Sequence, residues 1–413
     1  MNEWQDYFVE DIAAPGKNSL STGPFGSSIS SKFFVAHGVP VIRGGNLSPQ
    51  VGKRFNDEGL VFVSSEKAEE FSRSVVSSGD LIFTCWGTIN QVGLIDDKTQ
   101  YPKYVISNKQ MKLSVDPSKA SPLFLYYLFS TPDKQQEILN NGIGAAVPGF
   151  NLGQLRRMTV SLPTLKRQES IAAILNCFDE KLDLLHRQNK TLEDIAEALF
   201  RQWFIEEAHE SWEPVELGQL VDCFNGVSYK SEDLNPSSTA MVTLKNFNRD
   251  GGFRLDGFKG FTGKHKDTHI VIQGDLVVAH TDITQEADVI GNPVLIVADP
   301  AYEKLVISMD LVKVVSKYEW LSNEFLYRMM RTREFKQHCL GYSNGSTVLH
   351  LNKQAIPSYE VLLPPEQKVI DYTKIAKNIL NKKFENIAQF RTLESLRDTL
   401  LPKLISGEVR VSY

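Results

Sequence analysis

Residues 171–203, IAAILNCFDEKLDLLHRQNKTLEDIAEALFRQW, decide how this chain folds. Apolar side chains recur in this stretch at alternating steps of four and three, if Asn189 is included, at Ile171, Leu175, Phe178, Leu182, Leu185, Leu192, Ala196, Leu199 and Trp203. This spacing is the heptad seam of a coiled coil, sustained over more than four repeats. It predicts a long helix with one apolar stripe, on which Asn189 either fixes the register or is tolerated near solvent.

A second stretch, from about Gln367 to Leu404, repeats the pattern less regularly. Its apolar positions are Leu380, Phe384, Ile387, Phe390, Leu393, Leu396 and Leu400. About 38 residues at about 1.5 Å each give a helix of roughly 57 Å. Residues 161–210 carry six Lys and Arg against ten Asp and Glu, whereas residues 361–413 carry nine against six. Opposite charge favours pairing of the two helices, although a solvated charged face explains it equally well.

The second half of the sequence repeats motifs of the first half in the same order. Three motifs recur at one offset of 201 residues: Val105-Ile106-Ser107 as Val306-Ile307-Ser308, Phe124-Leu125-Tyr126 as Phe325-Leu326-Tyr327, and Leu162-Pro163 as Leu363-Pro364. Gly79-Asp80-Leu81 also recurs, as Gly274-Asp275-Leu276, and Asn46 corresponds to Asn246. Ordered matches over about 90 residues indicate an internal duplication.

Each copy begins with a part that mixes predicted strands and short helices, and it ends with one long helix. Short apolar runs predict strands at Val39–Ile42, Leu81–Thr84, Leu276–Ala279 and Val294–Val297. Helices are predicted at Phe124–Phe129 and Phe325–Met330, and the long loops Gly142–Asn151 and Leu340–Thr347 are rich in Gly and Ser. The predicted fold class is α+β: two similar globular domains, 1–160 and 211–361, related by a pseudo-two-fold axis and separated by two long antiparallel helices, within 161–210 and 362–413.

Composition narrows the class of protein. No stretch approaches the roughly 18 apolar residues of a membrane span, and the acidic first residues lead into no apolar signal segment. The four cysteines are far apart, which fits a reducing cytoplasm and argues against a structural zinc site. We therefore expect a cytoplasmic protein with no membrane contact. The net charge of −5 does not by itself indicate a nucleic-acid binder.

Two segments resemble a known family. Residues 162–175, LPTLKRQESIAAIL, and residues 396–411, LRDTLLPKLISGEVRV, are similar to the conserved regions of the specificity subunit of type I restriction-modification systems. The Gly-Asp-Leu strands fit the same resemblance, which covers the whole chain. It implies two target recognition domains, each reading one half of a bipartite, asymmetric double-stranded DNA site.

The same resemblance implies partners and cofactors. The helical regions would space the two domains and bind two methyltransferase subunits, which use S-adenosylmethionine, while restriction subunits that hydrolyse ATP and translocate DNA would join that core. S-adenosylmethionine, ATP and magnesium would then belong to the partner subunits, and this chain would bind no cofactor. Framework motifs recur between the copies while the loops diverge, as expected of two readers of different sequences.

We find no catalytic constellation in the sequence. The only Pro-Pro, Pro364-Pro365, is followed by Glu366, so the Asn/Asp-Pro-Pro-Tyr/Phe motif of an amino-methyltransferase is missing, and so is the phosphate-binding loop G-x-x-x-x-G-K-[ST]. Asp80 and Asp275 follow a glycine and are expected to be turn residues. We expect neither a catalytic nor a metal site. A two-domain, protein-recruiting scaffold is the alternative function, and a methyltransferase without recognisable motifs is a third.

Candidate DNA contacts are polar and basic residues in or beside the divergent loops, where Lys and Arg suit phosphate or guanine and Asn suits base edges. In the first copy they are Lys32, Arg43, Asn46, Asn90, Asn108, Lys109 and Gln110. In the second copy they are Tyr229, Lys230, Lys245, Asn246, His280, Thr281, Ser343 and Asn344. For any single position, a solvated loop residue is an equally good interpretation, so the hypothesis concerns the set.

Overall fold

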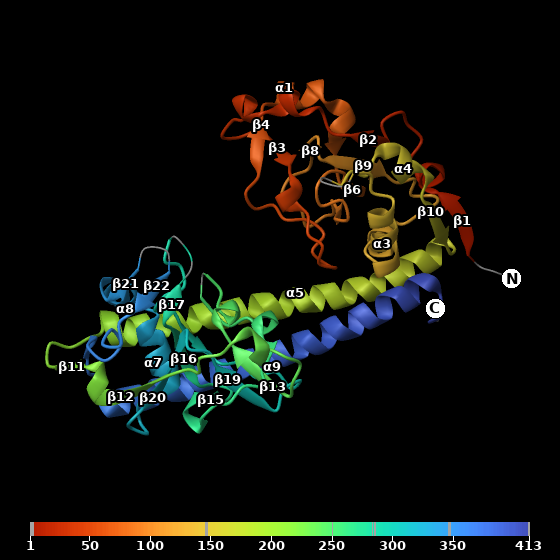
Figure 1. Ribbon diagram of the computed structural model, residues 1–413. Helices are drawn as coiled ribbons and strands as arrows, with labels where there is room; N and C mark the ends of the chain where they lie inside the picture. Colours follow the sequence, from red (N-terminus) through yellow and green to blue (C-terminus); the bar gives the residue numbers. More distant parts are fainter. Residues whose placement is uncertain are drawn as a thin grey trace. The chain divides into compact units, whose positions relative to one another are not determined.

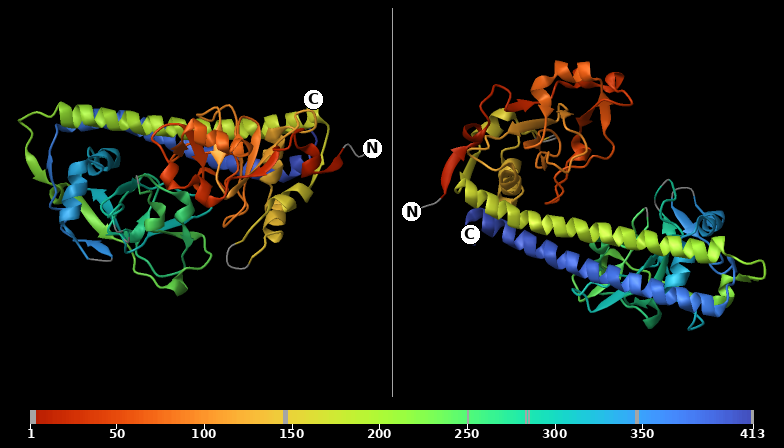
Figure 2. Two further views of the ribbon diagram at one scale, coloured as in Figure 1. Left: turned by 90° about the horizontal axis from the view of Figure 1, so that it is seen from above. Right: turned by 180° about the vertical axis from the view of Figure 1, so that it is seen from behind.

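The computed structural model describes residues 4–144, 148–249, 251–282, 284, 286–345 and 348–411 (Figure 1). The chain forms two compact units: unit 1 is Met1–Leu184 with Gln389–Tyr413, and unit 2 is Leu185–Ala388. The helices α5 (Leu165–Arg201) and α9 (Glu366–Ser406) are continuous, and each contributes to both units (Figure 2). The sequence assigns each helix to a segment of its own, whereas the compact units divide both helices between them.

Unit 1 contains two four-stranded sheets. The first is antiparallel, in the order β2 (Leu20–Thr22), β9 (Gln110–Ser114), β6 (Asp80–Thr84), β7 (Val92–Leu94). The second has the order β4 (Val61–Val63), β3 (Val39–Ile42), β8 (Tyr104–Ile106), β5 (Val75–Val76), and in it β3 and β8 run parallel. A separate pair joins β1 (Gln5–Phe8) to β10 (Thr159–Leu162).

Unit 2 has the same topology. Its antiparallel sheet has the order β12 (Val221–Asn225), β20 (Leu311–Ser316), β16 (Leu276–Ala279), β18 (Pro293–Leu295). Its mixed sheet has the order β14 (Lys259–Gly260), β13 (Thr239–Val242), β19 (Lys304–Ile307), β15 (Ile270–Val271), with β13 parallel to β19. A pair joins β11 (Pro214–Glu216) to β23 (Glu360–Leu362), and a small sheet has the order β17 (Thr281–Asp282), β22 (Leu349–Leu351), β21 (Ser343–Asn344).

The short helices include, in each unit, two that begin at the same kind of cap. In unit 1 the short helices are α1 (Ser65–Glu70), α2 (Pro122–Phe129), α3 (Pro132–Asn140) and α4 (Leu152–Arg157), and in unit 2 they are α6 (Leu217–Leu220), α7 (Asn323–Met330) and α8 (Arg333–Gly341). Ser121 and Ser322 cap α2 and α7, and Thr131 and Thr332 cap α3 and α8. Each side-chain oxygen accepts a first-turn N–H that has no partner within the helix.

These elements confirm the duplication. All six predicted strands and helices are present, although β18 ends two residues before Val297. The correspondence extends into the loops, where the bridge Trp86↔Gly149 in unit 1 occupies the place of Thr281↔His350 in unit 2; the offset is 195 residues for the first partner, as for Gly79-Asp80-Leu81, and 201 for the second. Residues 145–147 and 346–347 of the two predicted loops lie outside the described residues. Asp80 and Asp275 accept the backbone N–H groups of Ser77 and Ile272, at 2.9 and 3.0 Å, which confirms that they are turn residues.

The heptad seam of α5 is confirmed, but that of α9 is displaced at its end. Ile171, Leu175, Leu182, Leu185 and Ala196 are buried. On α9, the predicted seam residue Leu396 is 45% exposed, while its neighbour Arg397 is 3% exposed. The reason is electrostatic, because a carboxylate of α5 faces this position, as described next. Asn189 accepts a hydrogen bond from the buried Asn386 at 2.9 Å, which fits a polar pair that fixes register.

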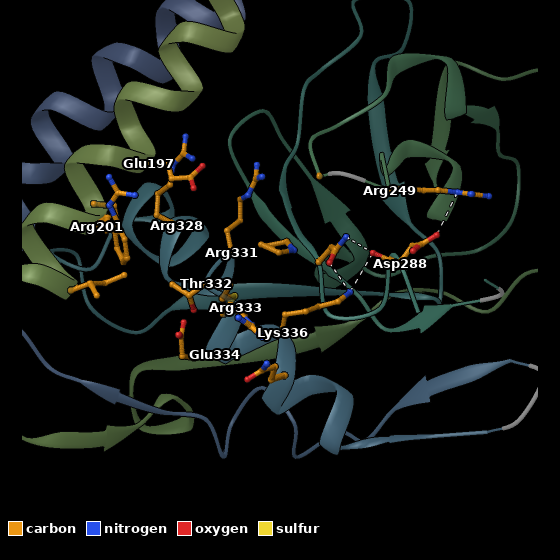
Figure 3. Close-up of a pocket in the computed structure, with 17 residues that line it drawn as sticks. Glu197, Arg201, Arg249, Asp288, Arg328, Arg331, Thr332, Arg333, Glu334 and Lys336 are labelled. Carbon is orange, nitrogen blue, oxygen red and sulfur yellow. Dashed lines mark hydrogen bonds and ion pairs between the residues drawn. The ribbon is translucent and has the colours of Figure 1, made fainter. Parts of the chain in front are cut away.

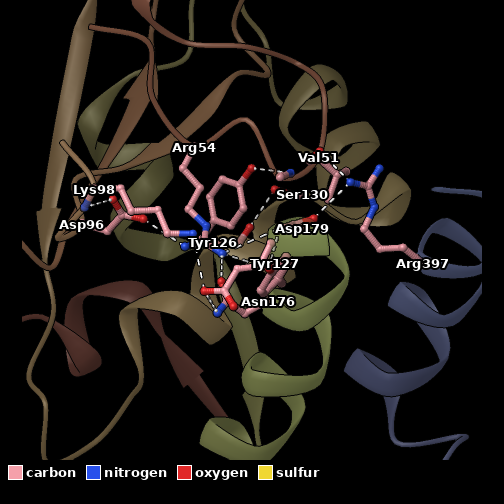
Figure 4. Close-up of polar contacts among 12 residues, drawn as sticks. Val51, Arg54, Asp96, Lys98, Tyr126, Tyr127, Ser130, Asn176, Asp179 and Arg397 are labelled. Atoms are coloured by element: carbon pink, nitrogen blue, oxygen red, sulfur yellow. Dashed lines mark hydrogen bonds and ion pairs between the residues drawn. The ribbon is translucent and has the colours of Figure 1, made fainter. Parts of the chain in front are cut away.

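A buried carboxylate, Asp179 of α5, joins the helices to the sheets of unit 1 (Figure 4). It accepts hydrogen bonds from the Tyr127 hydroxyl at 2.5 Å and from the Arg397 guanidinium at 3.1 Å. The Arg54 guanidinium lies 3.7 Å from it and also pairs with Asp96 at 2.9 Å. Asp179 thus connects α2, α9 and a loop of the mixed sheet at one point.

Glu193 of α5 does the same in unit 2. Its carboxylate forms ion pairs with Arg328 at 2.8 Å, with Arg331 at 2.9 Å and with Lys383 of α9. Burial opposes the charged form of Glu193, but the cations, Arg328 and Lys383 foremost, outweigh it and lower the pKa to about 2. In each unit, therefore, an acid of α5 pairs with a base of α9, as the opposite charge of the two segments predicts.

Candidate nucleic-acid interface

In unit 1, five loops meet at the carboxyl ends of the parallel strands β3 and β8. The N–H of Ser107 donates to the carbonyl of Ile42 at 3.1 Å, so the loops that follow the two strands begin side by side. A Cβ on Gly23 would lie 1.8 Å from the carbonyl oxygen of Ser107, so the loop after β2 packs directly against them. A side chain cannot be accommodated there.

The other two loops join through Cys85. Its N–H donates to the carbonyl of Lys109 at 2.8 Å, and its carbonyl accepts from the N–H of Phe150 at 3.0 Å. We call the described residues 23–34, 43–46, 85–91, 107–110 and 148–151 the loop edge of unit 1.

Unit 2 builds the same edge from different residues. The N–H of Ser308 donates to the carbonyl of Val242 at 2.9 Å, and a Cβ on Gly226 would lie 2.2 Å from the carbonyl oxygen of Ser308. The backbone N–H of His280 donates to the carbonyl of Asp310 at 2.7 Å, and the carbonyl of His280 accepts from the N–H of Leu351 at 2.8 Å. The loop edge of unit 2 comprises the described residues 226–230, 243–249, 280–282, 308–310 and 343–345.

The two edges leave seven of the fifteen predicted contact residues fully exposed and four half-buried. The side chains open to solvent are Lys32, Arg43, Asn108, Lys109, Lys230, Lys245 and Asn344. Half-buried are Asn90, Tyr229, His280 and Ser343. The Arg43 guanidinium donates to the carbonyl of Gly59 at 2.8 Å, and the Ser343 hydroxyl donates to that of Leu340 at 2.8 Å, so these two are held in place. The backbone thus gathers cations and amides from distant parts of the sequence.

Two predicted contacts, Asn46 and Asn246, are corrected by the structure. They are 3% and 0% exposed. The Asn46 amide accepts from the N–H of Arg43 at 2.9 Å and donates to the carbonyls of Asn56 and Glu58 at 2.9 and 3.0 Å. The Asn246 amide accepts from the N–H of Thr243 at 2.9 Å and donates to the carbonyl of Arg254 at 2.8 Å. Both amides close the turn after the parallel strand, so they support the edge from the interior and are not exposed on it.

Gln110 and Thr281 are also buried. The side-chain oxygen of Gln110 accepts the N–H of Ser107 at 3.0 Å and also its hydroxyl, which shapes the loop after β8. Thr281 lies within β17. Burial prevents these two side chains from reaching a base edge, so they too are corrected from contact residues to supporting residues.

His280 is the predicted contact with the most unusual surroundings. Its Nε2 is buried and has no hydrogen-bond partner among the described residues. Burial lowers its pKa, and the nearby His350 and Lys353 act in the same direction. The imidazole is therefore neutral near pH 7, and its Nε2 is a buried polar atom that the described residues leave without a partner.

Sequence reasoning missed two exposed aromatic residues, Trp86 and Phe25, on the edge of unit 1. The Trp86 ring lies over Gly149, where a Cβ would come within 2.7 Å of it, and the residue remains 54% exposed. Phe25 is 81% exposed, beside Gly26, whose added Cβ would approach the Asn108 amide at 3.1 Å. An aromatic residue next to glycines in a loop was the available signal, because small neighbours leave a ring uncovered.

The fold and its edges define a duplicated recognition chain: two sheet domains of one topology, each with a convergent set of loops and each anchored to the same two helices. Residues 1–194 match the family model described as type I restriction modification DNA specificity domain. Over these residues, the match confirms the resemblance to type I restriction-modification specificity subunits that the sequence predicts.

The similar proteins are distant in sequence. The chain is 22% identical to the type I restriction enzyme MjaIX specificity subunit of Methanocaldococcus jannaschii, over 84% of this chain and 82% of that protein. It is also 22% identical to the HindI specificity subunit of Haemophilus influenzae, over 82% and 88%. The solved S subunit of a type I restriction-modification system from M. genitalium shares the fold, with a TM-score of 0.61 and 16% identity over 97% of this chain and 96% of that one. Among the described residues, no helix combines the length and apolar character needed to cross a bilayer.

Proposed function

We propose that this chain reads a bipartite double-stranded DNA site, one half-site with the loop edge of each unit. The observation that carries the proposal is the repeated framework with divergent edge residues. Asn46 and Asn246 close the same turn, while Arg43 of unit 1 corresponds to Thr243 of unit 2, and Gly45 corresponds to Lys245. Arg and Lys at these edges suit guanine and phosphate, and Asn108 and Asn344 suit adenine.

We further propose that the chain supplies no catalysis and binds no cofactor. Two methyltransferase subunits would dock on α5 and α9 and use S-adenosylmethionine, and restriction subunits would add ATP- and magnesium-dependent DNA translocation in the cytoplasm. The family supports this division of labour. Exposed apolar residues on the helices, such as Ile174, Leu184, Ile195 and Ile375, suit a protein partner.

Replacing residues 212–360 with the corresponding domain of another specificity subunit tests the proposal. We expect methylation by the assembled complex to change at one half-site and to stay unchanged at the other. Mapping methylated adenines in DNA from cells that express the hybrid measures this. A folded hybrid that changes both half-sites would contradict independent reading, and a wild-type complex that retards no duplex would favour the protein-recruiting scaffold.

A further inference from the structure

A basic cavity of about 700 Å³ lies in unit 2 (Figure 3). Its walls are the C-terminal part of α5, the turn between α7 and α8, and the loops that carry Arg249 and Asp288. The cations that line it are Arg201, Arg249, Arg328, Arg331, Arg333 and Lys336, and the acids are Glu197, Asp288 and Glu334. Two acids outside the lining pair with some of these cations: Glu206 lies 3.1 Å from Arg201, and Glu193 pairs with Arg328 and Arg331. In a chain of net charge −5, the cavity still keeps a small local excess of positive charge.

Three of these cations, Arg249, Arg333 and Lys336, make no hydrogen bond to an acidic side chain among the described residues. Arg333 is exposed, and its guanidinium makes no hydrogen bond or ion pair with another described residue. Arg249 has a side chain that is 77% exposed and lies 3.8 Å from Asp288, a distance too long for a hydrogen bond. Lys336 donates to the carbonyl of Ile290 at 2.6 Å and to the Asn292 side chain at 2.8 Å, which are neutral acceptors. Arg328 and Arg331 are held in place by Glu193.

The cavity continues the loop edge of unit 2. Arg249 lies in the loop that carries Lys245, four residues further on, and Asp288 and Asn292 lie in the loop that follows Thr281. Figure 3 shows Arg249 and Asp288 on one side of the cavity and Arg201 and Arg328 on the other. A ligand that extends from the predicted base contacts along either loop would therefore reach these cations.

The backbone of this region forms in unit 1 without cations at these positions. At the offset of 201, Arg331, Arg333 and Lys336 correspond to Ser130, Pro132 and Gln135 of unit 1. Nevertheless α3 and α8 have equivalent threonine caps and equal lengths. The cluster is thus an addition specific to unit 2, and its conformation is maintained by Glu193 and by backbone carbonyls.

We propose that this cavity binds phosphodiester groups of the DNA backbone beside the half-site that unit 2 reads. The inference rests on the proposed function. Guanidinium groups fit phosphate oxygens in a two-pronged geometry, and each neutralised phosphate releases condensed counterions. The contact carries no sequence information, and it would position the duplex against the reading loops.

The test uses the chain assembled with its methyltransferase partners and a duplex carrying the recognised site. The variant is Arg249→Ala with Arg333→Ala, and the control is Lys264→Ala with Lys304→Ala, which removes the same charge. Lys304 begins β19 and Lys264 follows β14, so both are exposed at the opposite end of the mixed sheet from the loop edge. Affinity is measured from low to high salt.

Losing two phosphate contacts should reduce the slope of log affinity against log salt by about 1.8, and lower affinity on the order of tenfold to a hundredfold at 0.1 M salt. The methylated sequence should not change. A neutral methylphosphonate linkage at the contacted phosphate should weaken the wild-type complex and not the variant. Equal slopes for variant and control would overturn the proposal. So would a loss of assembly with the methyltransferase in place of a loss of DNA affinity. Failure of the wild-type complex to bind its site would instead overturn the proposed function.

Discussion

Glu193→Gln should loosen unit 2 while leaving unit 1 intact. The substitution keeps the size of the side chain and removes its charge, so Arg328, Arg331 and Lys383 lose the carboxylate that they share. The Arg328 side chain is only 7% exposed, so solvent cannot replace the lost partner. We therefore expect the contact between α7 and the two long helices to open more easily.

The pKa of Glu193 gives the magnitude. A shift from 4.5 to about 2 corresponds to about 3 kcal/mol in favour of the folded, ionised state. Because the folded pKa is the lower one, this stabilisation is complete well above pH 4.5 and is lost as the pH falls toward 2. Near pH 3.5 about 2 kcal/mol should remain. The difference in stability between wild type and Glu193→Gln should fall to this same value at pH 3.5.

Amide hydrogen exchange resolves the two units within one chain. At pH 7 the amides of α7 should exchange on the order of a few hundred times faster in Glu193→Gln, and at pH 3.5 about thirty times faster than in wild type. The amides of α2 in unit 1 serve as an internal standard. Asp194→Asn is the matched control, because Asp194 is the next residue of α5 and is exposed. If Glu193→Gln accelerated α7 no more than this control, the buried ion pairs would not hold unit 2 together.

Three further predictions follow from the loop edges and the helices. Asn46→Ala and Asn246→Ala should each lower the free energy of unfolding by roughly 1–3 kcal/mol, because buried backbone groups lose their hydrogen-bond partners. Thermal unfolding measures this loss. A stable variant with altered base preference would refute the supporting role. Trp86→Ala should weaken binding to the half-site of unit 1 by about tenfold to a hundredfold without lowering the melting temperature, and equal loss on a duplex lacking that half-site would argue against it. Inserting one heptad after Leu185 and one near Ile387 should lengthen each helix by about 10 Å. Methylation should then shift to sites with about three more base pairs between the half-sites. An unchanged spacing preference would contradict a spacer role.

The helices and the duplication could be predicted because their signals are local and repeated. A seam such as Ile171–Leu175–Leu182 depends only on residues a few positions apart, and the offset of 201 links motifs without any knowledge of contacts. The edges were predicted as a set for the same reason, since the loops that diverge between copies are visible in the sequence. Seven of the predicted side chains are open to solvent.

The buried members of the predicted set show where this reasoning fails. An asparagine after an apolar strand suits a base edge and a closed turn equally well, and the choice depends on carbonyls ten or more residues away, such as those of Asn56 and Glu58. The recurrence of Asn46 as Asn246 was the available clue. Residues that read different sequences should differ between the copies, so a residue kept in both is expected to support the framework.

The buried ion pairs could not be found from the repeat, because they do not obey it. At the offset of 201, the bases Lys383 and Arg397 of α9 correspond to Leu182 and Ala196 of α5. Two copies of α5 paired in the same register would therefore leave Asp179 and Glu193 without these cations in the interior, at a cost of several kcal/mol each. The helices have diverged so that α5 is stabilised by α9 better than by another α5. The duplication preserved the backbone of each unit, whereas the charges that fix it arose separately in each half.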